Sequence, residues 1–413
     1  MATDLPSSPP VAVFDADAPP ALAFVRSIGR MGAPVHVYGS GRFGVASLSR
    51  YATESRPSPP VEDASRFLPF LVEQLERGAI ELIAPTSDLL AFYLACVYDL
   101  LGPRMRAVLP TREAILDVLL KDRFHARCQA LGQATPKTLC PTSLGEAMDL
   151  AQDIAWPVIL KPRSHVGVGL ARGVLVSDRD ELAREFKPYP IHAGNLPILE
   201  HAPDVRWPMV QEYVPDALQN LYSVSGVIDT DGRVVACASS RKSTQWPPNL
   251  GVGTSFSAHD DERVRDLGVK LAGAILGRGI FEIELIYDRR HDAYIAIDLN
   301  PRAFGQIALD IARGNDLPSL WYRLANGEEV AACASPEDDV RWVHAIPYHL
   351  GQWIGVVTGP ARLERLSVYV DTLKHRHIDV VLDSSDPLPA IAFTAKMLRH
   401  PGGLVRPFLS SRS

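Results

Sequence analysis

The chain contains few cysteines, and they show no pairing pattern. Its 413 residues include five, Cys96, Cys128, Cys140, Cys237 and Cys333, and none of them forms a C-x-x-C motif. An odd and scattered set of this kind argues against a disulfide framework and against a zinc site built from thiolates. We therefore expect a protein of a reducing compartment, located in the cytoplasm.

The sequence also lacks a hydrophobic run long enough to cross a membrane. The longest, Leu89 to Tyr98, ends at Asp99, well short of the roughly 20 residues that a spanning helix needs. Met1 to Pro10 show no basic stretch followed by an apolar one, so they do not resemble a secretion signal. We expect a buried helix over Leu89 to Tyr98 and no membrane partner.

An excess of positive charge is missing as well. The chain has 42 Lys and Arg against 48 Asp and Glu, a net charge of -6, which argues against nucleic acid as a partner. The glycine fingerprint of dinucleotide-binding folds is absent after the first expected strand, where the chain reads Asp15-Ala-Asp-Ala-Pro-Pro20. These absences disfavour a bulk polyanion and NAD but leave room for a local basic pocket.

The first part of the chain shows alternating strand-like and helix-like segments, a pattern that predicts a parallel α/β unit. The expected strands are 11–14, 35–38, 80–84 and 107–110, and the expected helices are 21–31 and 89–98. At about 150 residues per domain, the length predicts two to three domains. With 46% apolar residues, the chain can bury a sizeable core.

The pattern changes after a helical segment that spans Thr111 to Leu131 and stops at Gly132. Short strands joined by glycine-bearing turns follow, and they predict an antiparallel α+β region. These strands are 157–162, 174–176, 210–214, 222–228, 234–239, 281–287 and 293–299.

The most informative residues lie on the last two of these strands. Successive strand side chains point to opposite faces, so Glu282 shares a face with Glu284, and Asp298 shares one with Asn300. Three acids and an amide on one patch need a compensating cation, and oxygen ligands of this kind suit Mg²⁺. Arg302 adds a guanidinium that can hold a phosphate or carboxylate. The alternative interpretation is a solvated hairpin with a surface salt bridge.

A lysine and two glycines form a second feature. Lys161 ends an apolar stretch, where an unpaired ammonium would be unfavourable, so it needs an anion. Gly167 and Gly169 follow in a loop whose backbone N–H groups could face phosphate oxygens, although turn glycines are the ordinary explanation. The three residues together predict a phosphate site.

In their order along the chain, these features resemble the ATP-grasp ligases. The resemblance rests on Lys121-Asp-Arg-Phe124 ahead of Leu131-Gly132, Pro157-Val-Ile-Leu-Lys161-Pro, Val166 to Gly169, Gln211-Glu-Tyr-Val214, Phe281-Glu-Ile-Glu284 and Ile297-Asp-Leu-Asn-Pro-Arg302. It is clearest over residues 111 to 330. The fold it implies is an ATP-grasp fold, α/β and α+β, with a preceding Rossmann-like parallel α/β domain.

The resemblance also implies a division of the chain into four parts. These are a Rossmann-like domain at 1–110, a lysine-bearing subdomain at 111–205, a metal-binding subdomain at 206–335 and a C-terminal extension at 336–413.

ATP and Mg²⁺ are the cofactors that the resemblance implies, and it gives each motif residue a role. The residues for the nucleotide are Lys121, Lys161, Gly167, Gly169 and the hinge Gln211, Glu212, Tyr213 and Val214; those for one or two Mg²⁺ ions are Glu284, Asp298 and Asn300; and Arg302 would stabilise the transferring group. Without the resemblance, Lys121 is an ordinary exposed helix lysine, and the hinge is a plain edge strand.

Two positions depart from the family pattern. Asp298 stands where relatives usually carry Glu, and its shorter side chain can shift the metal ion. Gln219 and Asn220 stand where relatives often carry an acid for the ribose hydroxyls, which leaves the ribose contacts open.

Two further residues are candidates for substrate contact. Lys242 lies in a polar segment, Ser239 to Thr254, where we expect it to meet the γ phosphate or an acidic substrate. Gly251 to Ser255 would form a mobile lid, or else the whole segment is a solvated loop. Asp88 either reaches the substrate from the first domain or caps a helix.

The activity that the resemblance implies is that of an ATP-dependent carboxylate–amine ligase. ATP would phosphorylate a small-molecule carboxylate, and an amine would attack the acyl phosphate to form an amide or peptide-like bond. The alternatives are another ATP-grasp activity, of the carbamoyl-phosphate, carboxylase or carboxylate–thiol ligase type, or a nucleotide-binding module without turnover. Such enzymes are often homodimers.

Overall fold

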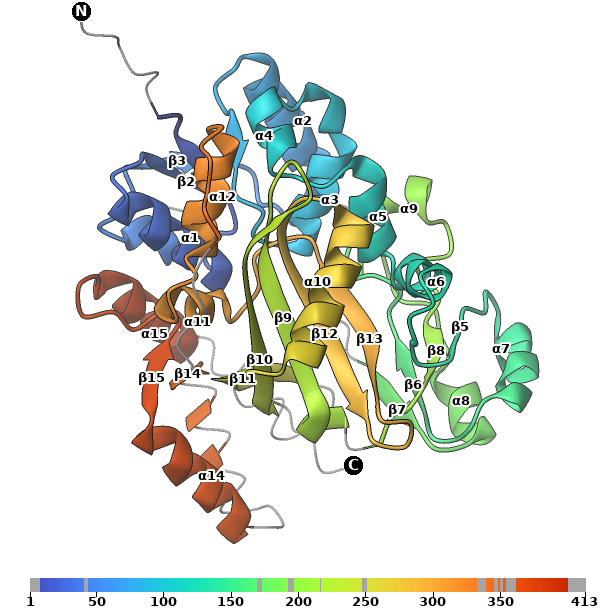
Figure 1. The fold of residues 1–413 in the computed structure, drawn as a ribbon. Helices are drawn as coiled ribbons and strands as arrows, with labels where there is room; N and C mark the ends of the chain where they lie inside the picture. The colour runs from blue at the N-terminus through green and yellow to red at the C-terminus, as the bar shows by residue number, and fades with distance from the viewer. Residues whose placement is uncertain are drawn as a thin grey trace, which may run out of the picture.

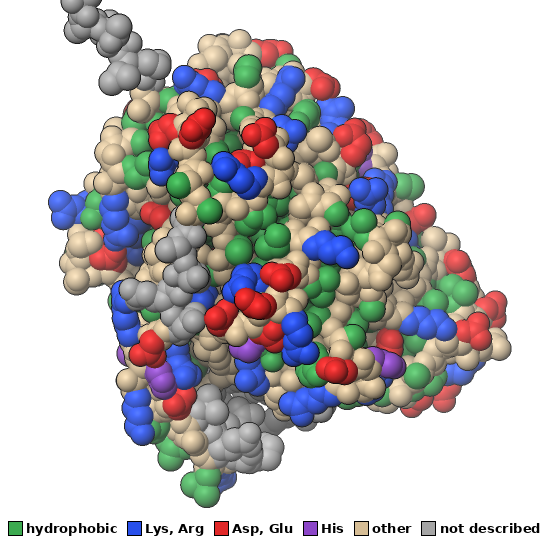
Figure 2. All heavy atoms as spheres, in the orientation of Figure 1, with side chains coloured by type: hydrophobic (Ala, Val, Ile, Leu, Met, Phe, Trp, Pro, Cys, Tyr) green, Lys and Arg blue, Asp and Glu red, His purple; other side chains and the backbone are tan. Residues whose placement is uncertain are grey.

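A computed structural model describes most of the chain (Figure 1). The residues described are 8–40, 44–168, 173–191, 197–215, 217–246, 251–332, 339–344, 348–349, 352–353 and 362–399. They form three β-sheets with helices packed against them. No helix among these residues combines the length and apolar character that a membrane span requires. Acidic and basic side chains are interspersed on the face seen in Figure 2.

The first sheet is parallel, as the alternating pattern predicts. Its strands, in the order β3-β2-β1-β4, are β1 Val11–Val13, β2 Val35–Gly39, β3 Glu54–Pro57 and β4 Leu82–Ile83. The helices between and after them are α1 Pro19–Arg30, α2 Ala64–Glu76 and α3 Asp88–Cys96. Every residue of β1 is buried, as expected for a parallel strand covered on both faces.

Two features of this region differ from the prediction. Residues 107–110 are not a strand, because Ala107 ends helix α4 (Pro103–Ala107) and Val108 and Leu109 are buried beyond it. A short apolar run does not distinguish a strand from a buried helix end. Strand β3 was not expected, because its exposed edge position leaves it with the polar sequence Glu-Ser-Arg-Pro.

The predicted helix over Thr111 to Leu131 is two helices, α5 Arg112–Leu119 and α6 Lys121–Ala130. The break lies at Leu120, whose backbone is extended with φ -103° and ψ 103°. A second sheet follows, antiparallel throughout, in the order β5-β8-β6-β7. Its strands are β5 Thr138–Leu139, β6 Val158–Lys161, β7 Val174–Val176 and β8 Met209–Glu212, and the helices of this part are α7 Leu144–Leu150, α8 Arg179–Glu185 and α9 Ile198–His201.

The third and largest sheet has the order β13-β12-β9-β10-β11-β14-β15. Its strands are β9 Leu221–Ile228, β10 Val234–Trp246, β11 Val252–Ala258, β12 Gly279–Asp288, β13 Ala293–Asn300, β14 Val340–Val343 and β15 Arg376–Asp379. The helices that follow or cover it are α10 Glu262–Leu276, α11 Ile307–Ala312, α12 Leu317–Ala325, α14 Arg362–Lys374 and α15 Leu388–Arg399. Figure 1 shows α10 lying across β9 and β12.

Alternation along β12 decides which side chains face the candidate site. Phe281, Ile283 and Leu285 share a core with residues of α10, including Val264 and Leu271. Because side chains alternate, the intervening Glu282 and Glu284 lie on the opposite face of the sheet. The side of the sheet away from α10 therefore carries the polar residues.

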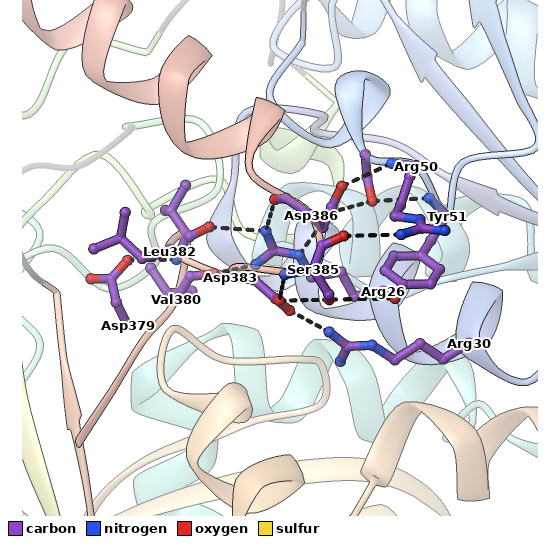
Figure 3. A network of polar contacts seen from close by, with 12 residues as sticks. Arg26, Arg30, Arg50, Tyr51, Asp379, Val380, Leu382, Asp383, Ser385 and Asp386 are labelled. Carbon is purple, nitrogen blue, oxygen red and sulfur yellow. Dashed lines mark hydrogen bonds and ion pairs between the residues drawn. The ribbon is translucent and has the colours of Figure 1, made fainter. Parts of the chain in front are cut away.

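The C-terminal segment is tied to helix α1 by a buried ion pair (Figure 3). Arg26 of α1 donates from Nε to Oδ2 of Asp386 at 2.9 Å, and its other nitrogens reach the carbonyls of Val380, Val381 and Asp386. Asp386 also accepts from Ser49 Oγ at 2.7 Å and from the backbone N–H of Arg50 at 2.9 Å. Segments 360 residues apart in sequence therefore share one set of hydrogen bonds.

Candidate functional site

The register of β12 and β13 brings the predicted polar residues together. Glu284 is the Cα partner of Asp298, and Glu282 is the partner of Asn300. The expected convergence on one face is confirmed. Glu282 has only 3% of its surface exposed, so the alternative of a solvated hairpin is wrong for this residue.

Lys121 begins helix α6, and its ammonium points at Asp298. Its backbone N–H donates to the carbonyl of Arg163 at 2.8 Å, and its Nζ lies 2.5 Å from Oδ2 of Asp298. Burial raises the pKa of Asp298, but the charge and hydrogen bond of Lys121 outweigh burial and hold that pKa below its usual value. Lys121 is thus a buried, paired lysine rather than an exposed helix residue.

Lys161 ends β6 and lies in the same electrostatic environment. Its Nζ donates to Oε1 of Gln211, on β8, at 3.0 Å. Burial, followed by the charge of Lys121, lowers the pKa of Lys161 to about 8. Two poorly solvated ammonium groups repel each other, so an anion placed between them would be strongly favoured.

Arg302 connects this patch to helix α3. Its Nε donates to Oδ1 of Asp88 at 2.5 Å, and a second nitrogen donates to Oδ1 of Asn300 at 3.0 Å. Burial raises the pKa of Asp88, but the Arg302 charge more than reverses this and lowers it to about 2. The cap of α3 is Ser87, whose Oγ accepts from Leu90 N–H, so Asp88 is free of the capping role and reaches the site.

Glu282 holds the other end of the Asn300 side chain. Nδ2 of Asn300 donates to Oε2 of Glu282 at 2.7 Å, while Oε1 accepts from Ser223 Oγ at 2.7 Å and from Gln306 Nε2 at 2.8 Å. Burial, followed by the charge of Glu284, raises the pKa of Glu282. These contacts fix the Asn300 amide, so that its oxygen faces Arg302.

A pocket opens where these groups meet. It is lined by Asp88, Val118, Leu119, Lys121, His165, Asp298, Leu299 and Asn300. Four candidates named from the sequence, Asp88, Lys121, Asp298 and Asn300, therefore line one pocket. Lys161 and Glu284 do not line it but lie close enough for their charges to interact.

The donor atoms of this patch fit Mg²⁺. Glu284 and Asp298 supply carboxylates on paired positions, and Asn300 supplies an amide oxygen. Mg²⁺ commonly uses one or two carboxylates and takes its remaining ligands from water and phosphates. Within the described ranges no group of three or more His, Cys, Asp and Glu residues could hold a metal.

The predicted hinge begins in the last two residues of strand β8 and continues to Val214. The backbone N–H of Glu212 donates to the carbonyl of Lys137 at 2.8 Å, and its carboxylate accepts from Arg290 at 3.0 Å. Val214 is buried in an apolar cluster with Leu221, Ile286, Ile295 and Ile297. The hinge strand is therefore paired and covered, not a plain edge strand.

Lys242 lies in a strand, which corrects the prediction for its segment. Residues 234–246 and 252–258 form the antiparallel pair β10 and β11, so the described residues of this segment are paired strands rather than a solvated loop. Lys242 is buried, and its charge contributes to the low pKa of Lys161. The sequence predicted only the first half of this strand, 234–239, because its later polar residues do not show a simple alternation.

The glycine loop is described only in part. Gly167 has φ +87°, a backbone conformation that favours glycine, whereas Gly169 lies outside the described residues. Sequence reasoning did not single out Gln306, Ser223 or His125, which contact site residues. Only His125 carried a signal, because it lies four positions after Lys121 on one helix.

Comparison with known proteins gives relatives of low identity. No protein-family model matches the chain. The chain is 24% identical over 228 residues to the carbamoyl phosphate synthase large chain, C-terminal section, of Methanopyrus kandleri, a match that covers 51% of this chain and 38% of that protein. It thus spans well under half the length of this relative.

Solved structures resemble the chain over most of its length. Biotin carboxylase from Campylobacter jejuni gives a TM-score of 0.61 at 18% identity and covers 80% of this chain and 74% of its own. The ADP complex of PurK, N5-carboxyaminoimidazole ribonucleotide synthetase, gives 0.61 at 10% identity, with 86% and 87% covered. L-amino acid ligase from Bacillus licheniformis gives 0.57 at 13%, with 78% and 75% covered. The fold of this chain is the one these proteins share.

Proposed function

We propose, from the ATP-grasp fold that this chain has, that it is an ATP-dependent carboxylate–amine ligase. The observation that carries the proposal is the placement of two buried lysines against a carboxylate pair. Lys121 and Lys161 interact electrostatically with each other and with Asp298, and Glu284 is the strand partner of Asp298. Phosphates between these groups and Mg²⁺ on the carboxylates would compensate both sets of charges.

The nucleotide would lie along the line from the hinge to the lysines. The apolar cluster of Val214, Leu221, Ile286, Ile295 and Ile297 offers a surface for an adenine ring. Lys161 and Lys121 would then contact the α and β phosphates. In this proposal the predicted hinge, Gln211 to Val214, forms one wall of the nucleotide site.

Mg²⁺, held by Glu284, Asp298 and Asn300, would neutralise charge on the β and γ phosphates. For the metal and the phosphates to bind, the Lys121 ammonium would break its contact with Asp298 and bind a phosphate oxygen instead. Glu282 keeps the Asn300 amide oriented during this exchange, because its own acceptors are satisfied by Ser223 and Gln306.

The reaction would proceed in two steps. A carboxylate oxygen of the substrate attacks the γ phosphorus, the bond to the β-phosphate oxygen breaks, and ADP leaves. An amine then attacks the acyl carbon, inorganic phosphate leaves, and the amine loses a proton. Arg302 and Lys242 would stabilise the charge on the transferring phosphoryl group, which makes positioning rather than a protein nucleophile the source of catalysis.

A second candidate is the phosphorylation of bicarbonate instead of an organic acid. Its specific support is the likeness to biotin carboxylase and to the carbamoyl phosphate synthase section. The two candidates share the first step and differ in the acid, so one assay can separate them.

The test is acid-dependent ADP release with MgATP and hydroxylamine, measured over a panel of carboxylic acids that includes bicarbonate. Hydroxamate formation with an organic acid supports the ligase, whereas ADP release with bicarbonate alone supports the second candidate. Binding of MgATP with no acid-dependent ADP release would point to a module without turnover.

Two variants test the assignment of the site. We expect Lys161→Ala and Asn300→Ala each to abolish ADP release while the circular dichroism spectrum stays unchanged. Lys270→Ala is the matched control, because Lys270 is an exposed lysine of α10. Turnover near the wild-type level in either site variant would show that the site is elsewhere.

A further inference from the structure

A chain of polar side chains runs behind the two lysines. Oε1 of Gln211 accepts from Lys161 Nζ at 3.0 Å, and Nε2 of the same amide donates to Thr138 Oγ1 at 3.0 Å. Thr138 Oγ1 lies 3.1 Å from Nδ1 of His125, and Gln211 Nε2 lies 3.4 Å from Nε2 of that ring. Each member therefore fixes the orientation of the next.

Two of these polar side chains, those of His125 and Gln211, are buried. His125 is 3% exposed and Gln211 is 2% exposed. Burial, followed by the charges of Lys161 and Lys121, lowers the pKa of His125 to about 4. The imidazole is therefore neutral at physiological pH, with one N–H donor and one acceptor nitrogen for its neighbours.

His125 also connects several elements that contribute to the phosphate site. It lies one helical turn after Lys121 on α6, and the backbone of Ile297, the residue before Asp298, lies close enough to its ring to raise its pKa. Through Thr138 of β5 and Gln211 of β8 it reaches Lys161 of β6. One side chain thus joins the helix of the first lysine, the strand of the acid and the sheet of the second lysine.

We propose that His125 is a positioning residue that, through Thr138 and Gln211, sets the place of the Lys161 ammonium relative to Lys121 and Asp298. The proposal rests on the proposed function, in which both lysines contact one polyphosphate. Without Thr138 and His125 the Gln211 amide is free to turn, and its donor group can then face Lys161. The lysine would lose its fixed acceptor while it keeps its charge and its strand position.

Thr138 offers the cleanest test, because Thr138→Val removes the hydroxyl and keeps the shape. We expect the Kd for MgATP, measured by calorimetry, to rise about tenfold in Thr138→Val and in His125→Phe, the loss expected for one hydrogen bond at a charged group. Thr138→Ser restores the hydroxyl and should recover most of the affinity. Thr394→Val, at an exposed site on α15, is the control for the same chemical change.

A second measurement needs no nucleotide. Competitive reductive methylation followed by peptide mass spectrometry gives the reactivity of Lys161 relative to the exposed Lys270. Loss of the Gln211 acceptor leaves the ammonium less stabilised, so we expect labelling at neutral pH to rise at least threefold in Thr138→Val and to return toward wild type in Thr138→Ser.

The outcomes separate the two proposals. If wild-type protein does not bind MgATP but Thr138→Val still changes Lys161 labelling, the proposed function fails, and the positioning of Lys161 by His125, Thr138 and Gln211 is supported. If the folded valine variant binds MgATP and labels like wild type, His125 is only a core histidine and the positioning role is overturned. Should His125→Phe not fold, the Thr138 pair decides alone.

Discussion

Replacement of Asp386 by Asn should detach the C-terminal segment from helix α1. The change removes the negative charge from a pair in which both side chains are almost completely buried, at 7% and 2% exposure. It leaves Arg26 with carbonyl partners only. Breaking a buried pair in this way costs about 3 to 5 kcal/mol, because the remaining guanidinium has no compensating charge.

The structure supplies a matched comparison for this perturbation. Arg30 on the same helix pairs with Asp383, but that pair is partly exposed, with 42% of the Arg30 side chain accessible. Exposed pairs are worth at most about 1 kcal/mol. Asp383→Asn therefore makes the same chemical change three residues away, with a small expected effect.

Hydrogen exchange followed by mass spectrometry measures the local opening. Peptides that cover residues 376–399 should exchange between about 10² and 10⁴ times faster in Asp386→Asn, since each factor of ten corresponds to about 1.4 kcal/mol. In Asp383→Asn the increase should stay below about tenfold. Equal exchange in the two variants would refute the reasoning that burial of the pair holds the segment in place.

Three further predictions follow from other parts of the structure. Gly268→Ala should destabilise the protein by about 1 to 3 kcal/mol, because the new Cβ would lie 2.5 Å from Val224. Gly273→Ala, on the same helix, meets nothing within 4 Å and should stabilise the protein. Urea unfolding of both variants measures the difference, and equal effects would contradict this account of the packing. Burial raises the pKa of Asp310 to about 7, so its contribution to stability is full below pH 4 and is lost as the pH rises through 7. Asp310→Asn should therefore gain stability over wild type between pH 5 and pH 8, up to about 4 kcal/mol, and a difference in Tm that does not change with pH would exclude this titration. Asp88→Asn should lower ADP release at least tenfold by freeing Arg302, with unchanged release as the contrary result.

The sequence predicted those parts of the site that depend on local patterns. Period-two alternation placed Glu282 with Glu284 and Asp298 with Asn300, and the register confirms both pairs. The order of the motifs predicted the fold that the comparisons show. The alternation is encoded within each strand, where side-chain direction follows directly from the backbone.

Partners across the fold could not be predicted in the same way. Lys121 and Asp298 are 177 residues apart, and Arg302 and Asp88 are 214 apart. Which charge meets which depends on how the sheets pack, and no local spacing encodes that. The expected strand at 107–110 failed for a related reason, since four apolar residues are buried equally well at a helix end.

The ion pair between Arg26 and Asp386 also has a consequence for synthesis on the ribosome. Arg26 emerges early, but its partner follows 360 residues later. At roughly 5 to 20 residues per second, that interval lasts about 20 to 70 s. During this time helix α1 carries a guanidinium whose eventual carbonyl and carboxylate acceptors do not yet exist. The first helix to be made is therefore among the last to acquire its complete set of contacts.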